Sequence, residues 1–188
     1  MTSMLVVLAL AAALALGAVG LYNRLVRLRN RAENAWSDID VQLRRRHDLV
    51  PNLVETVQGY ATHERKTLGE VTEARGSAMA ASDPASRARA EGELTRALRG
   101  LFAVAEAYPE LRANQNFLDL QARLAELEDA IQKARRYYNA VIRDLNTACE
   151  VFPSNLVAGV FGFHRGDYFE LAADAERSVP EARFGTSA

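Results

Sequence analysis

The residues before Arg24 restrict what this chain can fold into more than any other feature, because none of their side chains is charged. From Met4 to Tyr22 the sequence consists almost entirely of Leu, Val, Ala and Gly. About nineteen such residues in an α-helix, at 1.5 Å each, cover roughly the 30 Å hydrocarbon core of a bilayer. A cleaved signal peptide is the alternative, but it needs basic residues before the apolar run, whereas here the basic residues follow it. We therefore expect residues 1–23 to form a transmembrane anchor.

Arginines crowd the exit of this apolar run. Because segments rich in Lys and Arg stay on the cytoplasmic side, we expect a single-pass protein of the cell membrane, with its N-terminus outside and the following domain in the cytoplasm. The same side chains are candidate contacts to anionic lipid, although the simpler interpretation is that they stop transfer and extend along the lipid surface. The candidate headgroup contacts are Arg24, Arg27, Arg29 and Arg31.

Apolar residues after the anchor recur every three or four positions, which is typical of amphipathic helices. Ala, Leu, Arg and Glu dominate, and aromatic residues make up only 7% of the chain, so the composition also favours helices. The longest apolar stripes run over residues 25–57 and 111–145. Shorter helices are expected between them, one capped by Thr62 and one capped by Asp83 with Pro84 in its first turn. A break between Gly59 and Thr62 separates the first long helix from the shorter ones.

These lengths predict an all-α fold in which the N-terminal transmembrane helix precedes an antiparallel up-and-down four-helix bundle with long first and last helices. We place the bundle at residues 24–171 and a flexible tail at residues 172–188. The tail is small and polar in composition.

Aromatic residues and glycines gather between residues 151 and 171, after the last long helix. We expect a short helix from near Ser154 to fold back and close one end of the bundle, and a partner-binding patch is the alternative. The candidate interaction or structural residues of this segment are Phe161, Phe163, Tyr168 and Phe169.

Polar and aromatic residues of the first long helix are further candidates. Trp36 is either a core anchor or an exposed contact, and Asp38 lies on a polar face that either fixes register or docks a partner. His47 falls near the phase of the apolar stripe, which favours a buried, hydrogen-bonded histidine over a proton switch. We expect the run from Arg44 to Arg46 to be a solvated face.

These residues carry a resemblance to a known family. The segments that carry it are Tyr22-Asn23, Leu25-Val26, Arg29 to Arg31, Asn34 to Leu43, Arg45 to Val54, Gly59 to Ala61, His63-Glu64, Val71, Ala74-Arg75, Tyr108-Pro109, Asn116-Phe117, Leu120-Gln121, Tyr138-Asn139 and Phe152-Pro153 with Asn155. In these segments the chain resembles the LemA family. The resemblance implies a single-pass membrane protein with a short outside N-terminus, an antiparallel helical bundle and an uncertain molecular function. Some members of the family are associated with magnetosome membranes, which implies a possible part in membrane organisation.

Catalytic and metal motifs are missing where they would be expected in a helical protein. No Glu has a His three residues later, as a di-iron bundle requires, and Thr67 stands where a zinc protease helix beginning at His63 needs its second His. The chain has no phosphate-binding loop, and Cys149 is its single cysteine. We therefore expect a protein that is not an enzyme and that has no cofactor or metal.

Two functions follow from the sequence. The first is a protein-interaction scaffold held at the membrane, and the second is a lipid-binding, self-associating protein that organises the membrane. The expected partners are membrane lipid through the anchor and either a protein partner or a homo-oligomer. Nucleic acid is not expected, because the pI is about 6.3 and the formal net charge is −1.

Overall fold

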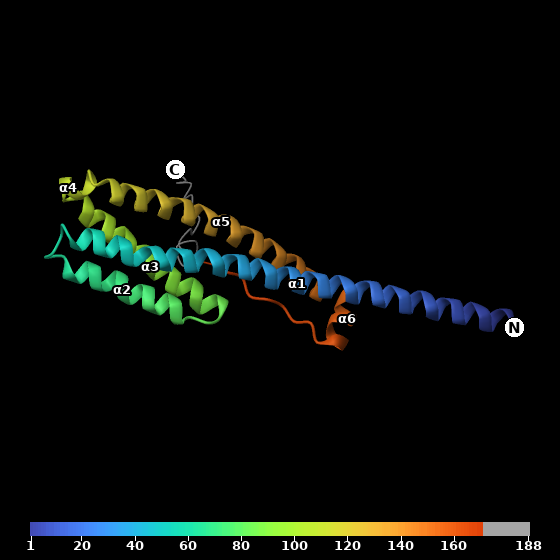
Figure 1. Cartoon of the computed structure of the whole chain (residues 1–188). Helices are drawn as coiled ribbons and strands as arrows, with labels where there is room; N and C mark the ends of the chain where they lie inside the picture. The colour runs from blue at the N-terminus through green and yellow to red at the C-terminus, as the bar shows by residue number, and fades with distance from the viewer. Residues whose placement is uncertain (171–188) are drawn as a thin grey trace, which may run out of the picture. The chain divides into compact units, whose positions relative to one another are not determined.

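The computed structural model describes residues 1–170, and the regular secondary structure of this part of the chain is entirely helical. The all-α class and the long first and last helices are confirmed. The tail predicted at residues 172–188 lies outside the described residues. The helices are α1 (Thr2–Gln58), α2 (Arg65–Ala80), α3 (Pro84–Glu106), α4 (Pro109–Arg112), α5 (Gln115–Glu150) and α6 (Ser154–Phe161) (Figure 1).

The chain folds as two compact units. The first contains Met1–Leu49 and Leu118–Tyr168. The second contains Val50–Phe117 and, among the described residues, also Phe169 and Glu170. Helix α1 is continuous, so the expected anchor and the first long helix after it are parts of one helix.

The first unit is built on the antiparallel pairing of α1 with α5. The ring centroids of Trp36 and Tyr138 lie 5.4 Å apart, and Arg46 forms an ion pair with Glu128. A step of ten residues along α1 therefore matches a step of ten residues backwards along α5. Both helices bury residues spaced three or four apart, as their apolar stripes predict. The buried residues include Leu25, Leu28, Ala32, Ala35, Ile39 and Leu43 of α1 and Ile131, Tyr138, Val141, Ile142, Leu145 and Ala148 of α5.

Helix α6 closes one end of this helix pair. The helix begins at Ser154 as expected and ends at Phe161. The next residue, Gly162, caps the helix with a φ of 69°, a left-handed conformation that suits glycine. The Phe163 amide donates to the Ala158 carbonyl across this turn, at 2.9 Å. One apolar cluster joins the inner face of α6 to the two long helices, and its buried members are Leu25, Leu28, Leu145, Ala148, Val157, Ala158 and Phe163.

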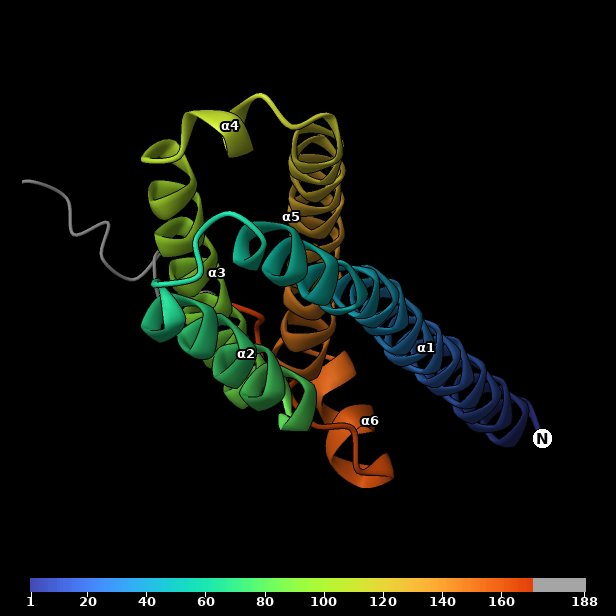
Figure 2. The ribbon, with the colours of Figure 1, turned by 60° about the vertical axis from the view of Figure 1, so that its left-hand side comes forward.

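The second unit contains the hairpin of α2 and α3, which lie side by side in both ribbon views (Figures 1 and 2). Asp83 caps α3 as predicted, because its side chain accepts a hydrogen bond from the Ser86 amide at 2.8 Å. The expected cap of α2 is wrong: the helix begins at Arg65, and Thr62 lies in the turn after α1. The expected break after Gly59 is confirmed, since α1 ends at Gln58.

Candidate functional site

A basic pocket of about 500 Å³ lies between α1 and α5 in the first unit. Four of its side chains are arginines, and a single acidic residue, Asp144, offsets them. Leu28 contributes a buried apolar wall. The residues that line the pocket are Arg24, Arg27, Leu28 and Arg31 of α1 and Arg143, Asp144 and Thr147 of α5.

Helix geometry explains which of the predicted arginines reach this pocket. Arg24, Arg27 and Arg31 are spaced three and four apart, so they share one face of α1. Arg29 lies about 140° around the helix from Arg24 and belongs to another surface. Its guanidinium carbon is 5.3 Å from the centroid of the Phe163 ring, and its Nε is 4.0 Å from a carboxylate oxygen of Glu33.

Arg143, Asp144 and Thr147 of α5 are pocket residues that the sequence analysis did not single out. The antiparallel register that pairs Trp36 with Tyr138 also places Arg143 at the level of Arg31, and Thr147 at the level of Arg27. The sequence predicted that the two long helices pair antiparallel. It did not predict their register, and without the register no particular residue of α5 can be placed opposite the arginines of α1.

The chemistry of the pocket suits an anion with several oxygen atoms. A guanidinium presents five N–H donors in a planar fork that matches the oxygens of phosphate or carboxylate. Guanidinium groups gathered beside one carboxylate repel one another, and a bound anion relieves this repulsion. The Thr147 hydroxyl adds a further donor at the pocket wall.

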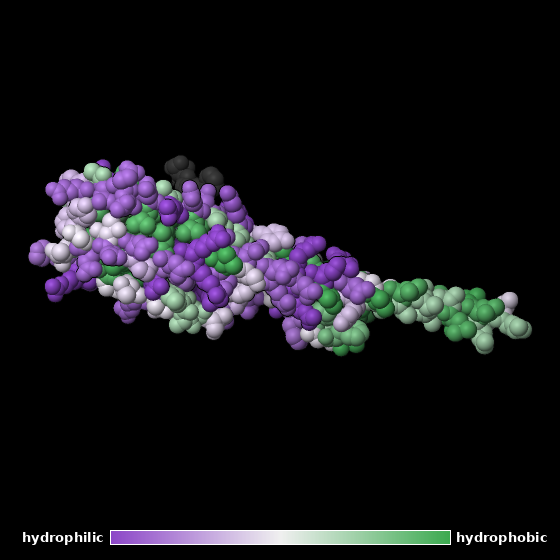
Figure 3. Space-filling model, in the orientation of Figure 1, coloured by the Kyte–Doolittle hydropathy of each residue, from purple (hydrophilic) through white to green (hydrophobic). Residues whose placement is uncertain are grey.

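The pocket lies directly after the apolar part of α1. In the described chain, α1 is the one helix long and apolar enough to cross a membrane, and none of its most apolar stretch is buried. Figure 3 shows this stretch as a hydrophobic rod next to polar residues. From Arg24 to Arg31 the helix rises about 10 Å, comparable to the roughly 5–8 Å depth of one headgroup layer.

The other candidate residues of α1 differ in their surroundings. Trp36 is half-buried against Tyr138, and Asp38 is exposed, so Asp38 does not belong to a buried polar cluster. His47 is buried, as its phase on the stripe predicts.

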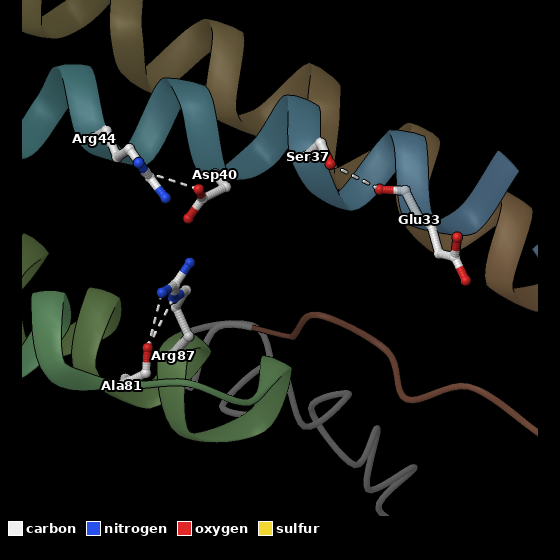
Figure 4. A network of polar contacts seen from close by, with 6 residues as sticks. All are labelled: Glu33, Ser37, Asp40, Arg44, Ala81 and Arg87. Carbon is white, nitrogen blue, oxygen red and sulfur yellow. Dashed lines mark hydrogen bonds and ion pairs between the residues drawn. The ribbon is translucent and has the colours of Figure 1, made fainter. Parts of the chain in front are cut away.

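The run from Arg44 to Arg46 is not a uniformly solvated face, and this expectation is wrong for Arg46. Arg44 is exposed and pairs with Asp40 at 2.8 Å (Figure 4). The Arg46 side chain is only 2% exposed, and its Nη1 donates to Glu128 at 2.5 Å. An arginine on the apolar face is accommodated because α5 supplies the carboxylate.

Two further side chains donate hydrogen bonds to nearby backbone carbonyls, one within α1 and one at a chain turn. In the first unit the Ser37 hydroxyl donates to the Glu33 carbonyl at 3.1 Å. In the second unit the Arg87 guanidinium donates to the Ala81 carbonyl, at 2.8 Å from Nη2, and thereby supports the turn between α2 and α3 (Figure 4).

The aromatic segment divides between core and surface. Phe163 and Phe169 are buried, and Tyr168 is half-buried. Phe161 is 58% exposed even though its ring centroid lies 4.8 Å from that of Tyr22. The segment is therefore partly core, and its open part lies around α6.

Reactive groups are sparse in the described residues. Within residues 1–170 no group of three or more His, Cys, Asp or Glu side chains is arranged to hold a metal ion. Burial raises the pKa of the Cys149 thiol, and the nearby Glu150 charge raises it further. The thiol is therefore held in its protonated, less nucleophilic form at neutral pH.

Comparison with known proteins identifies the family. The model of the LemA family matches residues 35–184, most of the chain. This chain belongs to the LemA family. The resemblance seen in the sequence is therefore confirmed.

Several known proteins are similar to this chain. Protein LemA of Metamycoplasma hominis is 27% identical over 160 residues, which cover 85% of this chain and 73% of that protein. Magnetosome protein MamQ 2 of Paramagnetospirillum magneticum and magnetosome protein MamQ of Magnetospirillum gryphiswaldense are each 26% identical, and each match covers 79% of this chain. The chain spans 64% of the length of each MamQ protein.

The LemA match includes only one side of the basic pocket. Arg143, Asp144 and Thr147 fall inside the matched range, whereas Arg24, Arg27 and Arg31 precede it.

Proposed function

We propose that this LemA-family chain is a membrane-anchored, non-enzymatic helical protein that binds the phosphate of anionic lipid headgroups in its basic pocket. The observation that carries the proposal is the convergence of Arg24, Arg27, Arg31 and Arg143 on one pocket directly after the apolar run of α1. The anchor places the pocket in the headgroup layer, where lipid phosphate is concentrated. Positive residues at the exit of the anchor favour the cytoplasmic leaflet and an outside N-terminus.

Arg143 distinguishes headgroup binding from a simple stop-transfer signal. Arginines that only stop transfer need to follow the apolar run in the sequence. Arg143 belongs to α5 and joins the other three only in the folded unit. Bringing a fourth guanidinium to this place costs electrostatic free energy, which a bound phosphate offsets.

Headgroup binding suggests a part in organising the membrane. A protein that holds anionic lipid beside its anchor enriches that lipid locally, and several copies would do so over a larger area. The names of the MamQ relatives, which describe them as magnetosome proteins, agree with a role at a membrane.

A protein-interaction scaffold is the second candidate, and a separate observation favours it. The second unit has an open groove of about 500 Å³ along the end of α1 and the start of α2. Gly69 leaves space in this groove, and the charged residues Arg65 and Glu73 are among those that line it, as in a surface that receives a partner helix. Filling the groove by Gly69→Leu would abolish capture of a protein partner and leave lipid binding unchanged.

The lipid composition around the protein tests the main proposal. The full chain is extracted from mixed bilayers of phosphatidylglycerol and phosphatidylcholine in polymer-bounded discs, and the lipids that remain with it are quantified. We expect phosphatidylglycerol to be enriched over the bulk bilayer, and high salt to reduce the enrichment because it screens charge at the pocket.

A matched pair of variants makes this experiment specific. Arg27→Gln with Arg31→Gln should lower the enrichment, whereas Arg29→Gln should retain it because Arg29 lies on the Phe163 side of α1. The two variants keep Arg24 and at least one further arginine at the anchor, so the orientation signal persists. Equal enrichment in the double variant and the wild type would refute headgroup binding in the pocket.

A further inference from the structure

The outer face of α6 is apolar and uncovered. Phe152, just before the helix, is 79% exposed, Leu156 is 60% exposed and Val160 is 79% exposed. Leu156 and Val160 are four residues apart and therefore share one face of α6. The helix sequence from Ser154 to Phe161 has no charged residue.

This face lies beside the membrane anchor. The centroid of the Tyr22 ring, at the end of the apolar run, is 4.8 Å from that of Phe161 and 5.7 Å from that of Phe163. Leu25 and Leu28, one and two turns further along α1, pack against the inner face of α6. Figure 3 shows hydrophobic residues gathered at this end of the first unit, next to the apolar rod of α1.

We infer that α6 is an interfacial helix whose outer face enters the same bilayer leaflet from which the anchor emerges. The inner face holds α6 on the helix pair while Phe152, Leu156 and Val160 contact lipid at the boundary between headgroups and acyl chains, about 5–10 Å deep. Tyr22 suits this boundary because an aromatic ring with a polar end is favoured there. The inference requires that α1 spans the bilayer, but it does not require lipid binding in the basic pocket.

Lipid fits this surface better than a second protein chain. The uncovered face is continuous with the apolar surface of the anchor, through the contact between Tyr22 and Phe161. Polar groups that commonly surround a protein interface are absent from α6 between Asn155 and Phe161. Glu150 and Arg165, which flank α6 in the sequence, pair with each other at 3.0 Å.

Spin labels on the full chain in discs that hold one copy test this inference. Cys149→Ala first removes the single native cysteine, and labels are then attached at Leu156→Cys or Val160→Cys. Leu14→Cys serves as the bilayer control, and Lys133→Cys, exposed on α5, serves as the water control. Because the labelled positions are exposed, labelling should not disturb the core, and a helical circular dichroism spectrum confirms the fold.

We expect the labels on α6 to collide with oxygen and to be shielded from a water-soluble nickel complex, as at Leu14→Cys. Accessibility to the nickel complex equal to that at Lys133→Cys would overturn the inference. Shielding that appears only in discs with two copies would also overturn it, because a second chain and not lipid would then cover α6. Shielded α6 labels together with no enrichment of anionic lipid would refute the headgroup proposal and support the interfacial helix.

Discussion

Asn146 of α5 makes two hydrogen bonds to the backbone of Gly166. Its Oδ1 accepts from the Gly166 amide at 2.8 Å, and its Nδ2 donates to the Gly166 carbonyl at 3.1 Å. The Asn146 side chain is buried, so both bonds are shielded from water. This pair ties the segment after α6 to α5 and thereby holds α6 at the end of the unit next to the apolar run of α1.

Replacing Asn146 by Ala should release this segment. The variant leaves the amide and carbonyl of Gly166 without their partner, so we expect a loss of about 1–3 kcal/mol in the free energy of unfolding. Hydrogen exchange of the full chain in micelles should become faster over residues 163–168. Gln121→Ala, at an exposed site of α5, is the control and should leave that exchange unchanged.

Tyr138 should make the first unit sensitive to alkali. Its hydroxyl donates to the Asp167 carbonyl at 2.9 Å, and burial, followed by the charge of Asp167, raises its pKa above the ordinary value of 10.0. Because the folded state holds this proton more tightly, the stabilisation is complete below pH 10 and is lost as the pH rises through the folded pKa.

Tyr138→Phe tests this expectation. At neutral pH the variant should lose about 0.5–1.5 kcal/mol through the missing hydrogen bond. Above pH 10 its stability should fall less steeply with pH than that of the wild type, in denaturant titrations followed by circular dichroism. Parallel pH profiles for the two proteins would contradict the assigned role of Tyr138.

Arg46 and Glu128 should be strongly coupled. The Arg46 side chain is 2% exposed, so its charge depends on protein partners, although Glu128 is 34% exposed and water screens part of the interaction. We expect a coupling energy of about 1–3 kcal/mol from a double-mutant cycle with Arg46→Ala and Glu128→Ala. The pair of Arg44 and Asp40 on the same helix, in which the arginine is exposed to water, should give less than about 1 kcal/mol.

The stabilisation of α3 by its cap, Asp83, should be lost at low pH. Hydrogen bonds from the Ser86 hydroxyl and amide lower the pKa of Asp83 below its ordinary value of 3.8. The stabilisation is therefore present above about pH 4 and is lost as the pH falls through the lower, folded pKa. Asp83→Ala should accelerate hydrogen exchange in the first turn of α3 and remove its acid dependence, whereas Asp83→Asn should keep most of the protection at neutral pH.

The sequence was sufficient to predict features that depend on local chemistry. The apolar stripes predicted α1 and α5, and Asp83 with Pro84 predicted the start of α3, because helix periodicity and capping act within a few residues. The start of α2 was misplaced because Thr62 has the composition of a cap but lies in a turn.

Features that depend on the register of α1 and α5 could not be read from the sequence. Arg46 looked like part of a solvated run until Glu128 was found opposite it, and Arg143 had no distinguishing neighbour in its own segment. Arg29 resembled the other three arginines, yet it lies beside Phe163 from the C-terminal segment. Each of these assignments needed a residue about 80 or more positions away.

Native mass spectrometry of the Arg143→Gln variant tests the central claim most directly, because Arg143 has no part in directing the anchor. The full chain is titrated with phosphatidylglycerol in micelles, with Arg136→Gln, two turns away and exposed on α5, as the control. We predict that Arg143→Gln weakens binding by about tenfold to a hundredfold, since a hydrogen bond to a charged group contributes about 1.5–3 kcal/mol, and that Arg136→Gln binds like the wild type. Equal affinity in all three proteins would contradict the assignment of the pocket as a headgroup site.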